Sequence, residues 1–285
     1  MFNVRIKRFL NTEQIQIFSE PLCNKDSERE DKRDIIYSTG EIVPPNRTKF
    51  YNPFDDCMDI GCNMGNDEEN LQRSVRRTKN KIYDVARCNH WEWFFTLTFN
   101  PEKVDSFNYD ETTQKLSKWL NNMRTKCKDM KYLVVPEQHE SGRWHFHGLF
   151  SNVENMKFVD SGKRDKKERV IYNVGSYRMG FTTATQIENV ECAMSYIAKY
   201  TTKDLCTVTK GHKRYWCSRN VDMPIIEDYM VMKSEKEIKE MFEDSITYSK
   251  RVSSEYCDVT YLEMPIYTTN TNFSKRYRQI KPYIV

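Results

Sequence analysis

Glycine is scarce in this sequence, and the glycine-rich loops that bind nucleotide phosphates are missing from it. There are 9 glycines among 285 residues, and neither Gly-x-x-x-x-Gly-Lys nor Gly-x-Gly-x-x-Gly occurs. Long apolar runs are missing too, since none approaches the length of about 18 residues that a membrane-spanning helix needs. The sequence therefore excludes a phosphate-binding loop of the usual kind and predicts no transmembrane helix.

Cysteine pairs with the spacing of zinc ribbons or redox motifs are also absent. The 9 cysteines include no Cys-x-x-Cys pair, and their odd number and wide spacing do not suit a disulfide framework. Residues 1–8 are partly basic but lack an apolar block before a cleavage site, so we expect no signal peptide. These features predict a reducing, intracellular compartment.

No charge of one sign dominates the composition. The 45 Lys and Arg residues nearly balance 41 Asp and Glu residues, which leaves a net charge of +4. Bulk charge therefore does not identify a nucleic-acid-binding protein. What is abundant is aromatic character, at 13% of residues with 17 tyrosines.

The order of strand-like and helix-like patterns predicts an α+β fold with an antiparallel sheet and helices packed on it. Apolar and β-branched runs predict strands at 93–99, 132–135, 144–150 and 181–187. Helical spacing of apolar residues predicts helices at 71–89, 109–126 and 190–204. We expect three regions: an irregular N-terminal extension over 1–70, a core domain over 71–221, and a C-terminal extension over 222–285 that packs on the core.

The helix predicted over 71–89 carries the densest group of basic residues. Its cations are Arg73, Arg76, Arg77, Lys79 and Lys81. A basic helix face can follow a nucleic-acid backbone, although a solvated face is the more common reason for such a pattern. Together with Arg143, these residues are the candidate DNA-binding set.

Two histidines on the strand over 144–150 form the first candidate site. Successive side chains of a strand alternate between faces, so His145 and His147 share one face. The other face holds Trp144, Phe146 and Phe150, which suit the core. Because the aromatic residues already supply a core face, we expect both imidazoles to lie on the opposite one.

The turn before this strand indicates a third donor. A three-residue loop over 140–142, with Gly142 in the left-handed conformation, pairs His139 with Arg143 and sets Glu137 across from His145. A two-residue loop would place Gln138 there instead. Two imidazoles and a carboxylate suit a divalent metal such as Mn²⁺, and Mg²⁺ less naturally.

The helix over 190–204 forms the second candidate site. At about 100° per residue, Tyr196, Tyr200 and Lys203 share one face with Lys199 at its edge, apart from the apolar stripe. Tyrosines four residues apart more often pack in a core. A phenol can nonetheless attack a phosphodiester that a metal polarises, with lysines favouring the phenolate.

These motifs resemble those of the HUH endonucleases. The resemblance rests on Phe95-Thr96-Leu97-Thr98-Phe99, Trp144-His145-Phe146-His147-Gly148-Leu149 and Tyr196-Ile197-Ala198-Lys199-Tyr200, in that order, and covers about residues 70–220. The wider pattern is similar to the two-tyrosine rolling-circle replication initiators of gokushoviruses (Microviridae).

The resemblance implies a ferredoxin-like or RRM-like sheet that carries the histidines centrally. It implies metal ligation by His145, His147 and Glu137, nucleophilic attack by Tyr196 and Tyr200, and supporting charge from Lys199 and Lys203. The implied activity is that of a single-strand DNA endonuclease and ligase, which nicks a phage origin to leave a 5′-phosphotyrosine and a 3′-hydroxyl primer. The implied partners are single-stranded origin DNA and the helicase and DNA polymerase of the bacterial host, in whose cytoplasm the protein would act.

Three alternatives remain open at this point. A noncatalytic nucleic-acid-binding module would use the sheet aromatics to stack bases and would form no covalent product. A metal-dependent hydrolase would use the histidines but leave the tyrosine pair idle. A transposase of the same superfamily shares the motifs.

Overall fold

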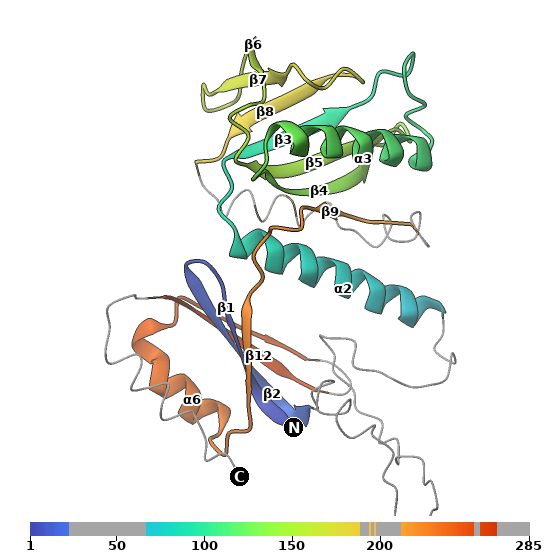
Figure 1. The fold of residues 1–285 in the computed structure, drawn as a ribbon. Coiled ribbons are helices and arrows are strands. Elements are labelled where there is room, and N and C mark those ends of the chain that lie inside the picture. Colours follow the sequence, from blue (N-terminus) through green and yellow to red (C-terminus); the bar gives the residue numbers. More distant parts are fainter. Residues whose placement is uncertain (23–66, 189–193, 195–196, 198–211, 254–256, 267–285) are drawn as a thin grey trace, which may run out of the picture. The chain divides into compact units, whose positions relative to one another are not determined.

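The computed structural model describes residues 1–22, 67–188, 194, 197, 212–253 and 257–266. They belong to two compact units, Asn66–Met223 and a unit that joins Met1–Gly65 to Pro224–Val285. Each unit contains one sheet whose strand pairs are all antiparallel, with helices beside it (Figure 1). The predicted α+β class is confirmed.

The larger unit contains a seven-stranded sheet in the order β6-β7-β8-β3-β5-β4-β9. Its strands are β3 (Trp93–Thr98), β4 (Lys131–Gln138), β5 (Trp144–Ser151), β6 (Phe158–Arg164), β7 (Val170–Val174), β8 (Thr182–Gln186) and β9 (Trp216–Cys217). Because β3 and β4 both run antiparallel to β5, they are parallel to each other with β5 between them. The strand that carries both histidines therefore lies inside the sheet, held by neighbours on both sides.

Helix α3 (Tyr109–Lys126) covers one face of this sheet (Figure 1). Its bounds coincide with the predicted helix, and its N-cap residue Asn108 accepts a hydrogen bond from the backbone N–H of Glu111. The buried side of α3 packs against alternate residues of the central strands, including Phe146 and Phe150 of β5. We call this side of the sheet the α3 face.

Helix α2 (Asp67–Cys88) packs on the opposite side of the sheet. Its residues Ile82, Val85 and Ala86 form a buried cluster with Leu133, Val135 and Leu149 of β4 and β5. This apolar stripe follows the helical spacing in the sequence. We call this side of the sheet the α2 face.

Gly148 lets two buried side chains of the α3 face approach the backbone of β5. A Cβ atom at this position would lie 2.5 Å from the ring of Phe150 and 2.9 Å from Val134 Cγ2. Phe150 cannot yield easily, because it is fully buried and stacks on Phe95 with ring centroids 4.3 Å apart. We expect Gly148→Ala to lower the free energy of unfolding by about 1–3 kcal/mol through overpacking.

Denaturation followed by tryptophan fluorescence measures this loss, because all 5 tryptophans lie within Asn66–Met223. The control is Thr183→Ala at an exposed position of β8, where we expect a change within about 0.5 kcal/mol. Equal stabilities for Gly148→Ala and wild type would contradict the packing argument.

The second unit contains a five-stranded sheet in the order β10-β1-β2-β12-β11. Its elements are β1 (Phe2–Arg8), β2 (Thr12–Leu22), β10 (Ile225–Tyr229), α6 (Glu235–Phe242), the 3₁₀ helix η1 (Glu243–Ser245), β11 (Tyr248–Val252) and β12 (Val259–Pro265). Ile238 and Phe242 of α6 pack on the apolar side of this sheet. Ser234 and Glu237 form a capping box that starts the helix.

This unit corrects two expectations. The N-terminal region is not irregular where it is described, since residues 2–22 contain two long strands. The C-terminal region does not form a separate extension, because its strands pair with these, as in the pairing of Val4 with Tyr229. Local patterns could not indicate a sheet whose partners are so far apart in the sequence.

Two findings bear on the composition. Among the described residues, no helix is both long enough and apolar enough to cross a membrane. Within the same residues, Cys88, Cys127, Cys217 and Cys257 are in the reduced thiol form.

Candidate functional site

The hairpin of β4 and β5 has the predicted register. The backbone N–H of His139 donates to the carbonyl of Arg143 at 2.8 Å, and Gly142 has φ of 82°. Glu137 pairs with His145, as a three-residue loop requires. The alternative loop is excluded, since Gln138 pairs with Trp144.

The two faces of β5 also follow the prediction. Phe146 and Phe150 lie on the α3 face, and Trp144 contacts Tyr109 of α3 with ring centroids 4.5 Å apart. Leu149 is buried on the α2 face, so His145 and His147, at alternate positions, lie on that face as well.

His147 is buried and has a partner on each ring nitrogen. Its Nε2 lies 2.6 Å from Glu137 Oε2, and its Nδ1 lies 3.2 Å from Thr96 Oγ1 of β3. Burial lowers the pKa of His147, although the hydrogen bond and charge of Glu137 act in the opposite direction. The contacts fit a neutral ring that donates from Nε2 to the carboxylate and accepts at Nδ1 from the hydroxyl.

His145 is half-buried at the outer end of the same row. Its ring stacks on that of His139, with centroids 5.3 Å apart. The pKa of His145 is lowered, first by burial and then by the neighbouring His139 and His147. Both strand histidines therefore favour the neutral form, which is the form that binds metals.

These residues have the donor atoms of a metal site, but their side chains do not converge on one point. Two neutral imidazoles and a carboxylate on one sheet face form a nitrogen and oxygen donor set that suits Mn²⁺. Within the described ranges, however, no group of three or more His, Cys, Asp or Glu side chains is arranged to hold a metal ion. Glu137 binds His147 directly, while His145 lies against His139.

Part of the segment predicted as the tyrosine helix contacts this same sheet face. Met194 and Ile197 are helical, and Ile197 is fully buried in the cluster that contains Val135 and Leu149. The predicted nucleophiles and their supporting lysines lie outside the described residues: Tyr196, Tyr200, Lys199 and Lys203.

The predicted DNA-binding cations come from two separate elements. On α2, Arg77, Lys79 and Lys81 are exposed and Arg76 is half-buried, while the Arg73 side chain lies outside the described structure. Arg143 is exposed at the start of β5, where its guanidinium lies 5.6 Å from the centroid of the Phe107 ring. These positions agree with a solvated helix face and equally with a surface that meets phosphates.

A cavity that no sequence pattern predicted lies beside His145, and Ser106 and Phe181 help to line it. Gly180 directly precedes Phe181 in the chain. A Cβ atom on Gly180 would lie 2.2 Å from the carbonyl oxygen of Thr98, so only glycine lets this chain segment meet the end of β3. The backbone of Phe181 is held there, since its carbonyl accepts from Thr98 N–H at 2.9 Å. A lone glycine before a predicted strand was the one available signal.

Comparison with known proteins gives one similarity. No curated protein and no solved structure matches the chain significantly. A family model matches less than half of the 285 residues, over a region that contains β3 to β8 and ends beyond Tyr200. Residues 92–205 of this chain are thus similar to the family described as Replication-associated protein ORF2.

Proposed function

We propose that this protein initiates DNA replication by cutting one strand at an origin through tyrosine transesterification. The family similarity over residues 92–205 supports a role in replication. The observation that carries the cutting chemistry is the burial of Ile197 on the α2 face, the face that holds His145 and His147. Because Ile197 lies between Tyr196 and Tyr200 in the sequence, its burial there favours tyrosines that act beside the histidines.

In the proposed reaction, a tyrosine oxygen attacks the phosphorus of a phosphodiester. The bond from phosphorus to the 3′ oxygen breaks, which leaves a 5′-phosphotyrosine on the protein and a free 3′-hydroxyl that can prime synthesis. The phenol proton passes to solvent and the departing 3′ oxygen takes up a proton, while Lys199 or Lys203 favours the phenolate by its charge. Attack of a 3′-hydroxyl on the phosphotyrosine reverses the step and joins strands, so two tyrosines allow a second cut before closure.

The residues on the sheet would contribute to this reaction by holding the metal-binding nitrogen and oxygen atoms in position. A divalent ion such as Mn²⁺ or Mg²⁺, bound by His145, His147 and Glu137, would polarise the phosphodiester as a Lewis acid. Thr96 orients the His147 ring through Nδ1, which leaves Nε2 directed at Glu137. Burial lowers the pKa of both imidazoles and so favours their neutral form, and a metal bound at His147 Nε2 would take the place of the proton there.

The proposal implies a particular setting. The substrate is single-stranded DNA at a phage origin, of the kind that gokushovirus initiators use, and the reaction takes place in the cytoplasm of the bacterial host. Strand unwinding would come from a helicase of that host, because the sequence contains no phosphate-binding loop of the usual kind. A DNA polymerase of the host would extend the 3′-hydroxyl.

A direct test incubates the protein with a panel of single-stranded phage DNA and Mn²⁺, then identifies adducted peptides by mass spectrometry. We expect a nucleotide adduct on the peptide that contains Tyr196 or Tyr200. DNA binding without cleavage would instead support a noncatalytic module, and cleavage without an adduct would support a hydrolase that uses water.

A further inference from the structure

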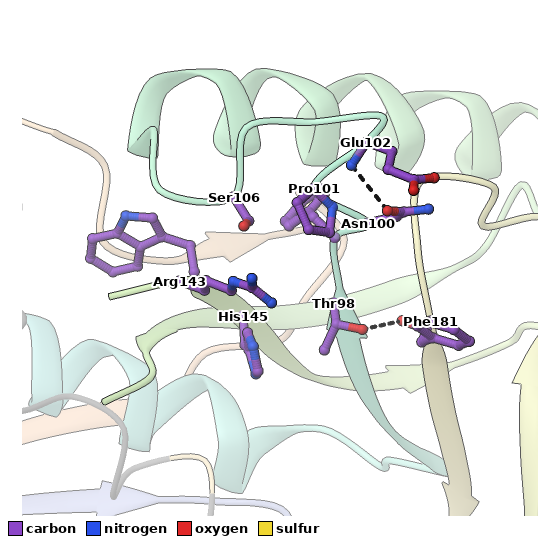
Figure 2. Close-up of a pocket in the computed structure, with 10 residues that line it drawn as sticks. Thr98, Asn100, Pro101, Glu102, Ser106, Arg143, His145 and Phe181 are labelled. Carbon is purple, nitrogen blue, oxygen red and sulfur yellow. Dashed lines mark hydrogen bonds between the residues drawn. The ribbon is translucent and has the colours of Figure 1, made fainter. Parts of the chain in front are cut away.

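A cavity of about 290 Å³ lies at the edge of the larger unit where β3 ends and β5 begins (Figure 2). His145 lines one side of it, so the cavity adjoins the candidate metal site. The other two candidate ligands, His147 and Glu137, do not line it. Its size is near the lower end of small-ligand pockets, which start at about 300 Å³. Glu102, Ser106, Arg143 and Phe181 are among the residues that line it.

Ser106 supplies a hydroxyl group that has no hydrogen-bond partner among the described residues. The residue is 1% exposed, and its Oγ is buried without a hydrogen bond. A buried polar group normally finds a partner, because leaving it without one costs about 1–3 kcal/mol. Ser106 is one of the residues that line the cavity, so a ligand there could supply the missing hydrogen bond.

Phe181 supplies an exposed aromatic ring on another side of the cavity. It is 80% exposed, the second highest value among the large exposed hydrophobic residues of the described chain. Its backbone is nevertheless fixed, since the Thr98 N–H donates to its carbonyl at 2.9 Å. The Thr98 hydroxyl donates to the same carbonyl at 2.9 Å (Figure 2). An exposed ring on a fixed backbone is suited to stacking against a flat ligand.

The charges around the cavity favour a neutral group that is attached to an anion. Arg143 is an exposed cation at its rim, whereas Glu102 is an exposed carboxylate on the same cavity. A free anion in the cavity would be attracted by Arg143 but repelled by Glu102. A nucleotide can place its neutral base in the cavity and its phosphate beside Arg143.

We propose that this cavity binds one unpaired base of single-stranded DNA, which stacks on Phe181 and forms a hydrogen bond with Ser106. The phosphate of that nucleotide meets Arg143. The choice of DNA rests on the proposed function, but binding of the base does not depend on cleavage. The site would hold the strand next to His145 and so select where the chain is cut.

The test measures binding by fluorescence anisotropy with EDTA present, so that no metal-dependent cleavage occurs. The probes are labelled 12-nucleotide oligomers of dT and dA and a 12-unit abasic oligomer, which has the same backbone charge but no bases. We expect the wild-type protein to bind the dT or dA oligomer more tightly than the abasic one. Phe181→Ala should reduce this preference about tenfold and leave abasic binding unchanged, because stacking acts only on a base.

Two further variants separate the parts of the site. Ser106→Ala should keep or raise thermal stability, since it removes a hydroxyl without a partner, and should change the ratio of dT to dA affinity. Arg143→Gln should weaken binding of all three oligomers alike and lower the salt dependence by about one charge. Tyr248→Ala is the control, because this exposed aromatic residue belongs to the other unit.

An unchanged base preference in Phe181→Ala would overturn the proposal, as would an unchanged dT to dA ratio in Ser106→Ala. Neither result would affect the proposed cleavage, which is measured by adduct formation. Conversely, the wild-type protein could form no adduct while these variants still lose the base preference. That result would support the base site and contradict the proposed function.

Discussion

Replacement of Tyr196 and Tyr200 together by phenylalanine is expected to abolish the covalent protein–DNA adduct. The substitution removes only the two phenol oxygens, and without either of them no group remains in the pair to attack phosphorus. The measurement is the amount of protein that shifts on a denaturing gel after incubation with labelled single-stranded origin DNA and Mn²⁺. We expect no shift above background for the double variant.

Each single variant should retain part of the adduct, because the two tyrosines can each form it. Tyr83→Phe on α2 is the matched control, since this phenol is exposed and lies in the same unit. It should form the adduct at the wild-type level. A double variant that still forms the adduct would falsify the assignment of the nucleophiles.

The second large effect is expected from His147→Ala, which should lower the initial rate of nicking with Mn²⁺ by about 100-fold or more. Residues that merely orient a metal ligand change affinity or activity by about 10–100-fold, so loss of a ligand should cost at least as much. The substitution also leaves Glu137 without the partner that lies 2.6 Å away. The rate is measured on a labelled oligonucleotide over a range of Mn²⁺ concentrations.

Two comparisons separate this metal role from a loss of folding. His90→Ala replaces an exposed histidine of the same unit and should nick at the wild-type rate. His147→Gln keeps a polar side chain in the buried position, and tryptophan fluorescence shows whether the unit remains folded. Titration calorimetry with Mn²⁺ should detect weaker binding to the folded variant, and a wild-type affinity or nicking rate would exclude His147 as a ligand.

Local sequence patterns predicted the histidine hairpin well because its geometry is set by short-range rules. The loop length and the left-handed Gly142 determine the register, and alternation along the strand then determines which side chains share a face. The bounds of α3 were predictable for the same reason, since its cap and apolar spacing lie within one segment.

These short-range rules do not predict which of the donor side chains contact each other. Glu137 pairs with His145 in the backbone register, yet its carboxylate reaches diagonally to His147, and the His145 ring stacks on His139. The register specifies the positions of backbones, whereas the side-chain rotamers depend on what surrounds them. The buried surroundings of His147 likewise include residues distant in the sequence, such as Phe94 and Thr96 of β3.

Periodicity and turn chemistry act over a few residues, so the α+β class, the central hairpin and the face on which both histidines lie could be predicted without a structure. The three-dimensional fold was needed to show that the N-terminal and C-terminal strands share one sheet, as in the pairing of Val4 with Tyr229. It also decided that Ser106, Phe181 and Arg143 surround one cavity beside His145. Contacts between such distant residues depend on how the whole chain packs, and no local pattern encodes them.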